Sequence, residues 1–194
     1  MKKLMLAGAL VAGALVAGLV SNVGFAAPNL YVAMDTSEGK IVLELNEEKA
    51  PITVGNFKNY VDDGFFDGLI FHRVIDGFMV QGGGFDADMK QKRAGKSIKI
   101  ESDNGLKNER GSIAMARTMD PNSASSQFFI NTQNNTFLDY PGQDGHGYTV
   151  FGKVVEGMDV VDRIEKVKTG MSNGHQDVPV KPVVIESAKF VEKP

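Results

Sequence analysis

Cysteine is absent from this chain of 194 residues, and only three histidines are present: His72, His146 and His175. Without a thiol, the chain has neither a cysteine nucleophile nor thiolate metal ligands, and it forms no disulfide. The histidines are too far apart for the spacings that are typical of metal-binding motifs. We therefore expect no metal ion and no other cofactor.

Long basic runs are also lacking. Two of the 21 basic residues, Lys2 and Lys3, lie in residues 1–26, together with none of the 24 acidic residues, so residues 27–194 carry a net charge of −5. This charge balance argues against nucleic acid as a partner. Gly82-Gly83-Gly84 is not followed by Gly-Lys-Ser/Thr at phosphate-loop spacing, and the Gly-x-Ser-x-Gly match at residues 170–174 does not lead into a helical pattern, so phosphate-loop and serine-hydrolase chemistry are not expected. These glycines indicate a β-bulge or a tight strand exit.

The first 26 residues have the composition of a secretory signal peptide. Lys2 and Lys3 are followed by an uncharged apolar stretch, Leu4–Val20, and then by small residues. Cleavage after Ala26 is favoured over cleavage after Ala27, because the latter would place bulky Phe25 at the −3 position. The alternative is an uncleaved membrane anchor, for which 17 apolar residues are the lower limit. The predicted division is a signal peptide, 1–26, and one domain, 27–194.

Short apolar runs dominate the remainder and predict a mainly β protein. One helix is expected within residues 50–66, with Pro51 in its first turn, Gly64 as the C′ residue just after it, and an inward face formed by Ile52, Phe57, Tyr60 and Val61. A second helix is expected over 158–166. About eight short strands with two helices predict a closed eight-stranded antiparallel barrel capped by the helices. The irregular stretches 84–97, 101–110 and 132–147 are candidates for binding loops.

An arginine among apolar residues is the most informative feature. In FHRVIDGFMVQGGGF, residues 71–85, strict alternation places Phe71, Arg73 and Ile75 on one face of a strand and His72 and Val74 on the other. This stretch alone leaves two interpretations open. Arg73 is either an ordinary exposed arginine on a half-solvated sheet or a functional group.

Two later segments favour a functional arginine. Gln127 precedes Phe128 and Phe129 in one, and Phe137 and Leu138 occur in the other. Together with Arg73 they predict a hollow lined by apolar side chains, one arginine and glutamine. This hollow has no nucleophile, no acid–base pair and no metal, so it suits a reaction that breaks no covalent bond.

Four motifs in these segments resemble those of the cyclophilins, a family of peptidyl-prolyl cis–trans isomerases. They are FHRVIDGFMVQGGGF, GSIAMAR followed by NSASSQFFI, FLD, and VFGKVVEGMDVVDRI. The resemblance covers nearly all of residues 30–192. The leader and the absence of cysteine make the chain most similar to bacterial cyclophilins exported to the periplasm.

This resemblance implies roles for individual residues. Arg73 matches the catalytic arginine, and Gln81 matches the glutamine that holds the substrate backbone. The apolar pocket for the proline ring would be lined by Phe78, Met79, Phe129 and Leu138. The neighbouring groove would be lined by Ala116, Arg117 and Gln127. Three positions differ from many eukaryotic members, which carry tryptophan, histidine and asparagine there: Phe137, Tyr148 and Arg117. Phe137 in place of tryptophan implies weak cyclosporin binding.

The expected function is therefore isomerisation of X–Pro bonds during folding of exported proteins. Its partners would be unfolded or partly folded polypeptides that contain proline. The protein is expected to act as a monomer, without nucleic acid and without a membrane once the signal is cleaved. The alternative is a chaperone module that binds proline-containing chains and isomerises them only incidentally.

Overall fold

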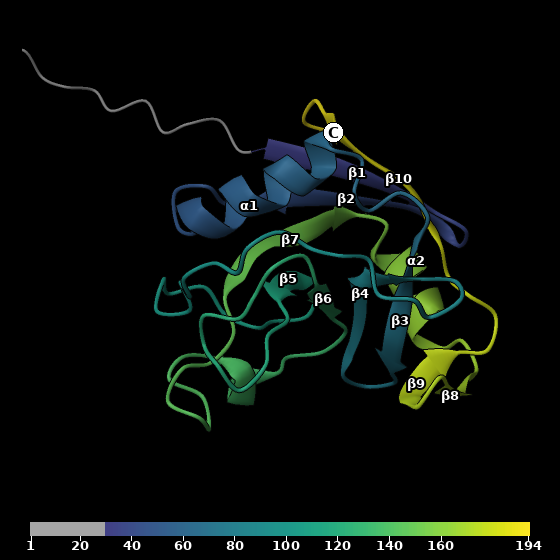
Figure 1. Ribbon diagram of the computed structural model, residues 1–194. Coiled ribbons are helices and arrows are strands. Elements are labelled where there is room, and N and C mark those ends of the chain that lie inside the picture. The colour runs from purple at the N-terminus through teal and green to yellow at the C-terminus, as the bar shows by residue number, and fades with distance from the viewer. Residues whose placement is uncertain (1–29) are drawn as a thin grey trace, which may run out of the picture.

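The computed structural model describes residues 30–194, so the predicted signal peptide, 1–26, lies outside the described residues. An eight-stranded antiparallel sheet dominates the fold, with the strand order β10-β1-β2-β7-β5-β6-β4-β3, and a separate hairpin, β8–β9, lies beside β3 (Figure 1). The strands are β1 (Leu30–Thr36), β2 (Gly39–Leu45), β3 (Leu69–Ile75), β4 (Met79–Asp86), β5 (Ser112–Met115), β6 (Phe128–Asn131), β7 (Val150–Glu156), β8 (Thr169–Ser172), β9 (His175–Pro179) and β10 (Ile185–Val191).

The sheet curves into a half-barrel, and the prediction of a closed barrel is wrong in this respect. Its edge strands β3 and β10 share no continuous ladder. They meet through an isolated bridge between Ile70 and Val184 and through two backbone hydrogen bonds, from Gly68 N to Ile185 O (2.8 Å) and from Phe71 N to Val183 O (3.0 Å). Closure would require a full ladder between the edges. The mainly β class, the antiparallel pairing and the two helices are as predicted.

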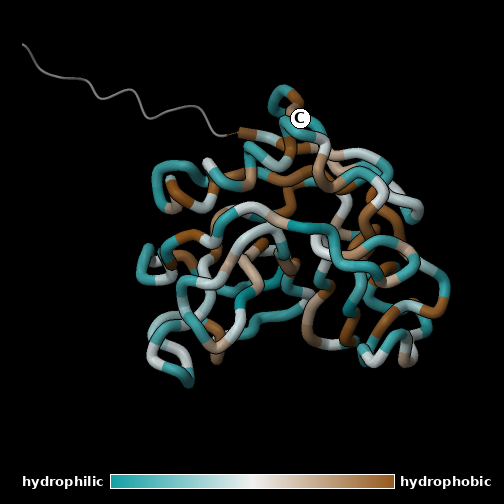
Figure 2. The backbone as a smooth tube through the Cα atoms, viewed as in Figure 1, coloured by the Kyte–Doolittle hydropathy of each residue, from teal (hydrophilic) through white to brown (hydrophobic). Residues whose placement is uncertain are grey.

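A cluster of phenylalanines fills the concave side of the sheet. Phe57 comes from helix α1 (Pro51–Asp62), and its ring centroid lies 5.0 Å from that of Phe66 and 5.2 Å from that of Phe151. Phe66 also meets Phe128 at 5.5 Å, edge to face. Such pairs add to the burial of large apolar surface. In Figure 2 most of the peripheral loops are hydrophilic, whereas the strands carry many of the hydrophobic positions.

Helix α1 follows its prediction except at one position. Phe57, Tyr60 and Val61 are buried and Gly64 follows the helix with φ +58°, but Ile52 is 45% exposed. Ile52 lies in the first turn, which the long loop after β4 approaches from the side. Glu101 of that loop accepts hydrogen bonds from Ile52 N (3.0 Å) and Thr53 N (2.8 Å), so a residue 48 positions away caps the helix.

Helix α2 (Met158–Glu165) matches the prediction, with Val160, Val161 and Ile164 buried. Of the stretches predicted to be irregular, 84–97 begins inside β4, and 132–147 contains a short 3-10 helix, η1 (Thr136–Leu138). Neither α-helix in residues 30–194 has the length and apolar character needed to cross a membrane.

Candidate active site

A bulge in β3 determines where Arg73 points. Phe71 pairs with Gly82 and Arg73 pairs with Gln81, so His72 is an extra residue in β3 that opposes no residue of β4. The bulge interrupts the alternation of faces. Phe71 and Val74 both enter the main core, and both His72 and Arg73 line a hollow on the other side of the strand. The prediction of strict alternation is therefore wrong at Phe71 and His72.

The three glycines of β4 allow the close packing that this arrangement needs. Gly83 has φ +82°, and a Cβ atom there would lie 2.7 Å from Ser126 O. A Cβ atom at Gly84 would lie 2.7 Å from Gln127 Cγ. The pairing between β3 and β4 also shifts between Leu69 and Phe71, which confirms the predicted bulge. The glycines thus let Gln127 lie flat against β4 at the edge of the hollow.

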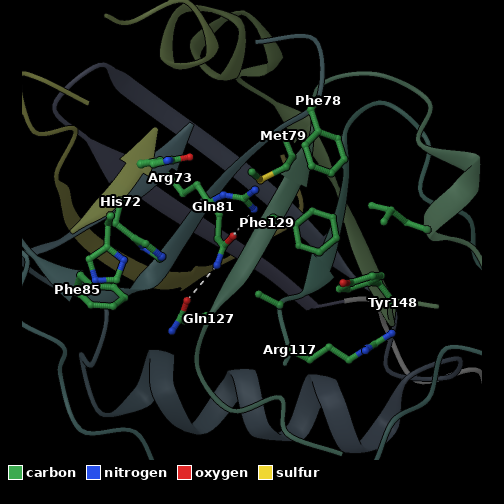
Figure 3. A pocket seen from close by; sticks show the side chains of 14 residues that line it. His72, Arg73, Phe78, Met79, Gln81, Phe85, Arg117, Gln127, Phe129 and Tyr148 are labelled. Carbon is green, nitrogen blue, oxygen red and sulfur yellow. Dashed lines mark hydrogen bonds between the residues drawn. The ribbon is translucent and has the colours of Figure 1, made fainter. Parts of the chain in front are cut away.

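The hollow has a volume of about 380 Å³ and brings together all but one of the predicted site residues (Figure 3). Its lining includes Arg73, Phe78, Met79, Gln81, Ala116, Arg117, Gln127, Phe129, Leu138 and Tyr148. Phe137 does not line it. That ring is 47% exposed and stacks on Phe78 with 5.7 Å between centroids, so it lies behind the rim. Four further lining residues were not predicted: His72, Phe85, His175 and Gln176.

One end of the hollow is apolar, and we call it the apolar lobe. It is formed by Phe78, Met79, Ala116, Phe129, Leu138 and Tyr148. The Phe129 and Tyr148 rings meet edge to face at 5.7 Å. Met79, Phe129 and Leu138 are themselves almost completely buried, so the floor of the lobe is packed and preformed.

A network of buried amides holds the rim of the apolar lobe in place. Asn135 Nδ2 donates to Phe78 O (2.9 Å) and to Asn131 Oδ1 (2.6 Å), while Asn131 Nδ2 donates to Ser112 Oγ (2.9 Å). Asn108 N in turn donates to Asp139 Oδ1 (2.7 Å), which follows the 3-10 helix. Because buried amides strongly prefer to be paired, this network fixes Phe78 and η1 relative to β6.

A polar strip crosses the middle of the hollow. Gln81 Nε2 donates to Gln127 Oε1 (3.0 Å), and Arg73 Nη1 contacts Gln81 Oε1 at a long 3.5 Å. The only ion pair of Arg73 within residues 30–194 is a 3.9 Å approach of Nε to Asp177 Oδ2, and 44% of its side chain is exposed. A guanidinium has five N–H donors. Most of those on Arg73 are therefore available to a ligand in the hollow.

The second arginine of the hollow is committed to other contacts. Arg117 donates to Gly147 O (3.0 Å from Nε), to Thr118 O (2.9 Å) and to Asp144 Oδ2 (2.5 Å). Its side chain is only 3% exposed, and its guanidinium carbon lies 4.3 Å from the centre of the Tyr148 ring. Arg117 lines the hollow as predicted, and its guanidinium holds the loop 142–147 in place.

The other end of the hollow, which we call the polar lobe, is formed by the four residues that were not predicted. Phe85 lies between two imidazoles, with 4.6 Å between its ring centroid and that of His72 and 5.1 Å to that of His175. Gln176 follows His175 in β9. Figure 3 shows His72 and Phe85 on one side of Arg73 and Gln81, with Phe78, Phe129 and Tyr148 on the other.

The sequence gives weak signals for the polar lobe. His72 adjoins Arg73, but strict alternation directed it to the opposite face. His175 and Gln176 lie about a hundred residues further along the chain, in a hairpin without a marked apolar pattern. Only the packing of that hairpin against β3 brings them to the site.

This arrangement is suited to binding a ligand with an apolar ring beside a hydrogen-bond acceptor. A fixed cationic donor stands next to a packed apolar lobe, and two glutamines beside it can donate and accept. Within residues 30–194, no group of three or more His, Asp or Glu side chains is placed to hold a metal ion.

Several proteins of similar sequence are named as peptidyl-prolyl cis-trans isomerases. Residues 31–190 match the family described as Cyclophilin type peptidyl-prolyl cis-trans isomerase/CLD. The chain is 59% identical to a peptidyl-prolyl cis-trans isomerase of Streptomyces antibioticus over 162 residues, which cover 82% of this chain and 98% of that protein. It is 54% identical to peptidyl-prolyl cis-trans isomerase B of Escherichia coli over 163 residues, covering 83% and 99% of the two chains.

A similar solved structure is that of a cyclophilin type peptidyl-prolyl cis-trans isomerase of Cryptosporidium parvum, crystallised in the presence of the dipeptide Ala-Pro. It is 26% identical with a TM-score of 0.72, and the match covers 84% of this chain and 99% of that chain. The half-barrel with two helices described above is therefore the fold of these isomerases.

Proposed function

The chain belongs to the cyclophilin-type peptidyl-prolyl cis–trans isomerases, and on that premise we propose that Arg73 is the residue that accelerates rotation about the X–Pro bond. Resonance holds this bond planar with a barrier of about 18–20 kcal/mol. In the twisted state the prolyl nitrogen loses its conjugation and regains a lone pair. A guanidinium N–H directed at that nitrogen stabilises the twisted state more than either planar state, which lowers the barrier.

The rest of the hollow supports this role. The apolar lobe would hold the proline ring still while the chain before it rotates, since its floor is packed and preformed. Gln81 would hold the substrate backbone, with its side chain oriented by Gln127 (3.0 Å). Arginine suits the task because it stays charged and its planar fork is rigid. No bond is broken, so neither a nucleophile nor a cofactor is required.

One observation carries the proposal. Within residues 30–194 the closest hydrogen bond of Arg73 is the long 3.5 Å contact to Gln81, so this side chain presents mostly unpaired donors at the border of a preformed apolar lobe. An arginine kept only for stability would be expected to use its donors within the protein, as Arg117 does. The free donors of Arg73 thus fit a group that bonds to substrate.

The test is exchange spectroscopy of a short Ala-Pro peptide, which measures turnover and affinity in one sample. Arg73→Ala should remain folded, lose about 10²–10³-fold in isomerisation efficiency, and bind the peptide with little loss of affinity. Arg93→Ala, which removes an exposed arginine outside the hollow, is the matched control. Near wild-type turnover by folded Arg73→Ala would assign the hollow a binding role, as in a chaperone module with incidental isomerisation.

We propose further that the natural substrates are unfolded or partly folded exported proteins that contain proline, met in the periplasm after removal of residues 1–26. The support is the run Leu4–Val20 after Lys2 and Lys3, with small residues at 24 and 26. Intact mass of the protein recovered after export should correspond to a chain that begins at Ala27. Retention of Lys2 and Lys3 in a membrane fraction would contradict export by cleavage. Proline-limited refolding steps take tens of seconds and should accelerate on addition of the mature protein.

A further inference from the structure

The polar lobe has no role in the mechanism above. It adjoins the polar strip on the side opposite the apolar lobe, and His72, Phe85, His175 and Gln176 form it (Figure 3). If a proline ring occupies the apolar lobe and Arg73 acts on its nitrogen, the chain on one side of the proline passes this second lobe.

An unsatisfied buried nitrogen marks the polar lobe as a binding site. The His72 side chain lines the hollow, only 5% of the residue is exposed, and its Nδ1 atom has no hydrogen-bond partner in residues 30–194. Buried polar atoms without partners are rare, because each costs the desolvation of that atom. Because Nδ1 is itself enclosed, a ligand group in the hollow recovers this cost only when the imidazole turns Nδ1 towards it.

The walls of the polar lobe are held in place. Val178 of β9 is buried against Ile70 of β3 and Met89, and Asn173 Nδ2 donates to Asp88 O (2.9 Å). The β8–β9 hairpin is thereby attached at its turn and along one strand. His175 and Gln176 are exposed on this anchored support, so they are available to a ligand in a defined position.

The chemistry of the lobe is that of neutral groups that both donate and accept. Burial lowers the pKa of His72 to about 4, with a smaller contribution from His175, so the imidazole is neutral at pH 7 and has one donor and one acceptor. Gln127 and Gln176 are amides. The full charges beside the lobe, Arg73 and Asp177, are of opposite sign and 3.9 Å apart.

We propose that the polar lobe binds the side chain of a residue that flanks the proline, and that it selects a carboxamide, glutamine or asparagine. A carboxamide is planar, as suits a site with the Phe85 ring between two imidazoles, and it carries both a donor and an acceptor for His72 and Gln176. A carboxylate would be buried beside a neutral imidazole, and an aliphatic side chain would leave Nδ1 unpaired. The proposal rests on the proposed function, since it assumes a proline in the apolar lobe.

The test uses two series of capped peptides, Ala-X-Pro-Ala and Ala-Ala-Pro-X, in which X is glutamine, glutamate, leucine or alanine. Isomerisation efficiency is measured for each by exchange spectroscopy. In one of the two series, glutamine should exceed leucine by about 2–10-fold, the gain expected from one neutral hydrogen bond. Glutamine should also exceed glutamate.

Two variants connect that preference to the lobe. His72→Phe keeps a flat ring against Phe85 and removes Nδ1, and the double variant His175→Ala/Gln176→Ala changes only exposed side chains of the hairpin. Both should bring the glutamine-to-leucine ratio close to one. His146→Ala, which removes an exposed histidine outside the hollow, should keep the wild-type ratio.

Each other result overturns the proposal. These results are equal rates for glutamine and leucine in both series, a preference for glutamate over glutamine, or a ratio that neither variant changes. Failure of the proposed function is seen separately, because the wild-type protein would then not isomerise Ala-Ala-Pro-Ala. In that case the affinities of the glutamine and leucine peptides are measured by chemical-shift titration. Their ratio decides whether the lobe selects a carboxamide.

Discussion

Arg73 and Arg117 line the same hollow, yet their guanidinium groups are in opposite situations. Arg117 is 3% exposed in its side chain and bonds to two carbonyls and one carboxylate. Arg73 is 44% exposed, with one 3.5 Å contact to Gln81 and one 3.9 Å approach to Asp177. The role of each arginine therefore follows from where its donors point. A guanidinium that is satisfied within the protein stabilises it, and one that is left unsatisfied can act on a substrate.

The largest effect on isomerisation is expected when lysine replaces Arg73, the exposed arginine. Arg73→Lys should recover little of the activity lost in Arg73→Ala, remaining about 10²–10³-fold below wild type, because a mobile ammonium cannot reproduce a fixed fork of donors. Thermal unfolding should change little, since the contacts of Arg73 with other residues of the described range 30–194 are weak. Turnover and melting temperature are measured on the same preparation. Recovery of most activity by lysine would show that charge alone suffices.

Replacement of Arg117, the buried arginine, is expected to affect stability. Arg117→Ala should destabilise the protein by about 1.5–3 kcal/mol, the range for a lost hydrogen bond to a charged group, because Asp144 and Gly147 O lose their partner. Denaturant titration measures this, with Arg93→Ala as control. An Arg117→Ala protein that is as stable as wild type but inactive would invert the roles assigned to the two arginines.

The location of the two arginines was predictable from the sequence, but the contacts of their guanidinium groups were not. The motifs placed both residues at the site, and the hollow contains both, along with the predicted apolar lining. They could not tell which guanidinium was free, because two of the three partners of Arg117, Asp144 and Gly147, come from a loop some thirty residues away. The bulge at His72 was missed for a similar reason. It depends on the glycines of the partner strand, whereas the alternation rule treats a strand by itself.

The positions of the helices were predictable from the sequence, but the distant contacts that hold them were not. Pro51, Gly64 and the spacing of apolar residues mark α1 locally, so its bounds follow from the chain. Its cap is Glu101, and no local pattern connects a residue 48 positions away to the first turn. The incomplete pairing between β3 and β10 was likewise hidden, because strand number alone does not determine whether the ends of a sheet pair fully.

That cap gives a smaller stability prediction. Glu101→Ala should cost about 0.5–2 kcal/mol, the range for loss of a helix cap, because Ile52 N and Thr53 N lose their acceptor. Glu192→Ala, at an exposed position near the C-terminus, is the control. Chemical denaturation of both variants measures the difference. Equal stabilities would mean that solvent replaces the carboxylate without loss.

The ion pair of Arg117 predicts a pH dependence. Hydrogen bonds from Arg117, His146 N and Gly147 N hold the pKa of the Asp144 carboxyl well below its usual range. A depressed pKa contributes stability that is full above about pH 5 and is lost as pH falls below the usual value of about 3.9. Asp144→Asn should therefore melt below wild type at pH 6, and the gap should narrow towards pH 3.5. A gap that stays constant or widens would contradict the ionised pair.

The smallest effect is expected at Phe137, behind the rim. This ring stacks on Phe78 and is 47% exposed, so a larger side chain there meets solvent and causes no clash. Phe137→Trp should strengthen cyclosporin binding by about 0.5–1.5 kcal/mol, because the indole adds contact area and an N–H donor beside Phe78. Isomerisation should hardly change, since position 137 does not line the hollow. Titration of wild type and variant with the drug gives the two affinities. Equal affinities would place residue 137 too far behind Phe78 to reach a ligand, and a large loss of isomerisation would show that it supports the apolar lobe directly.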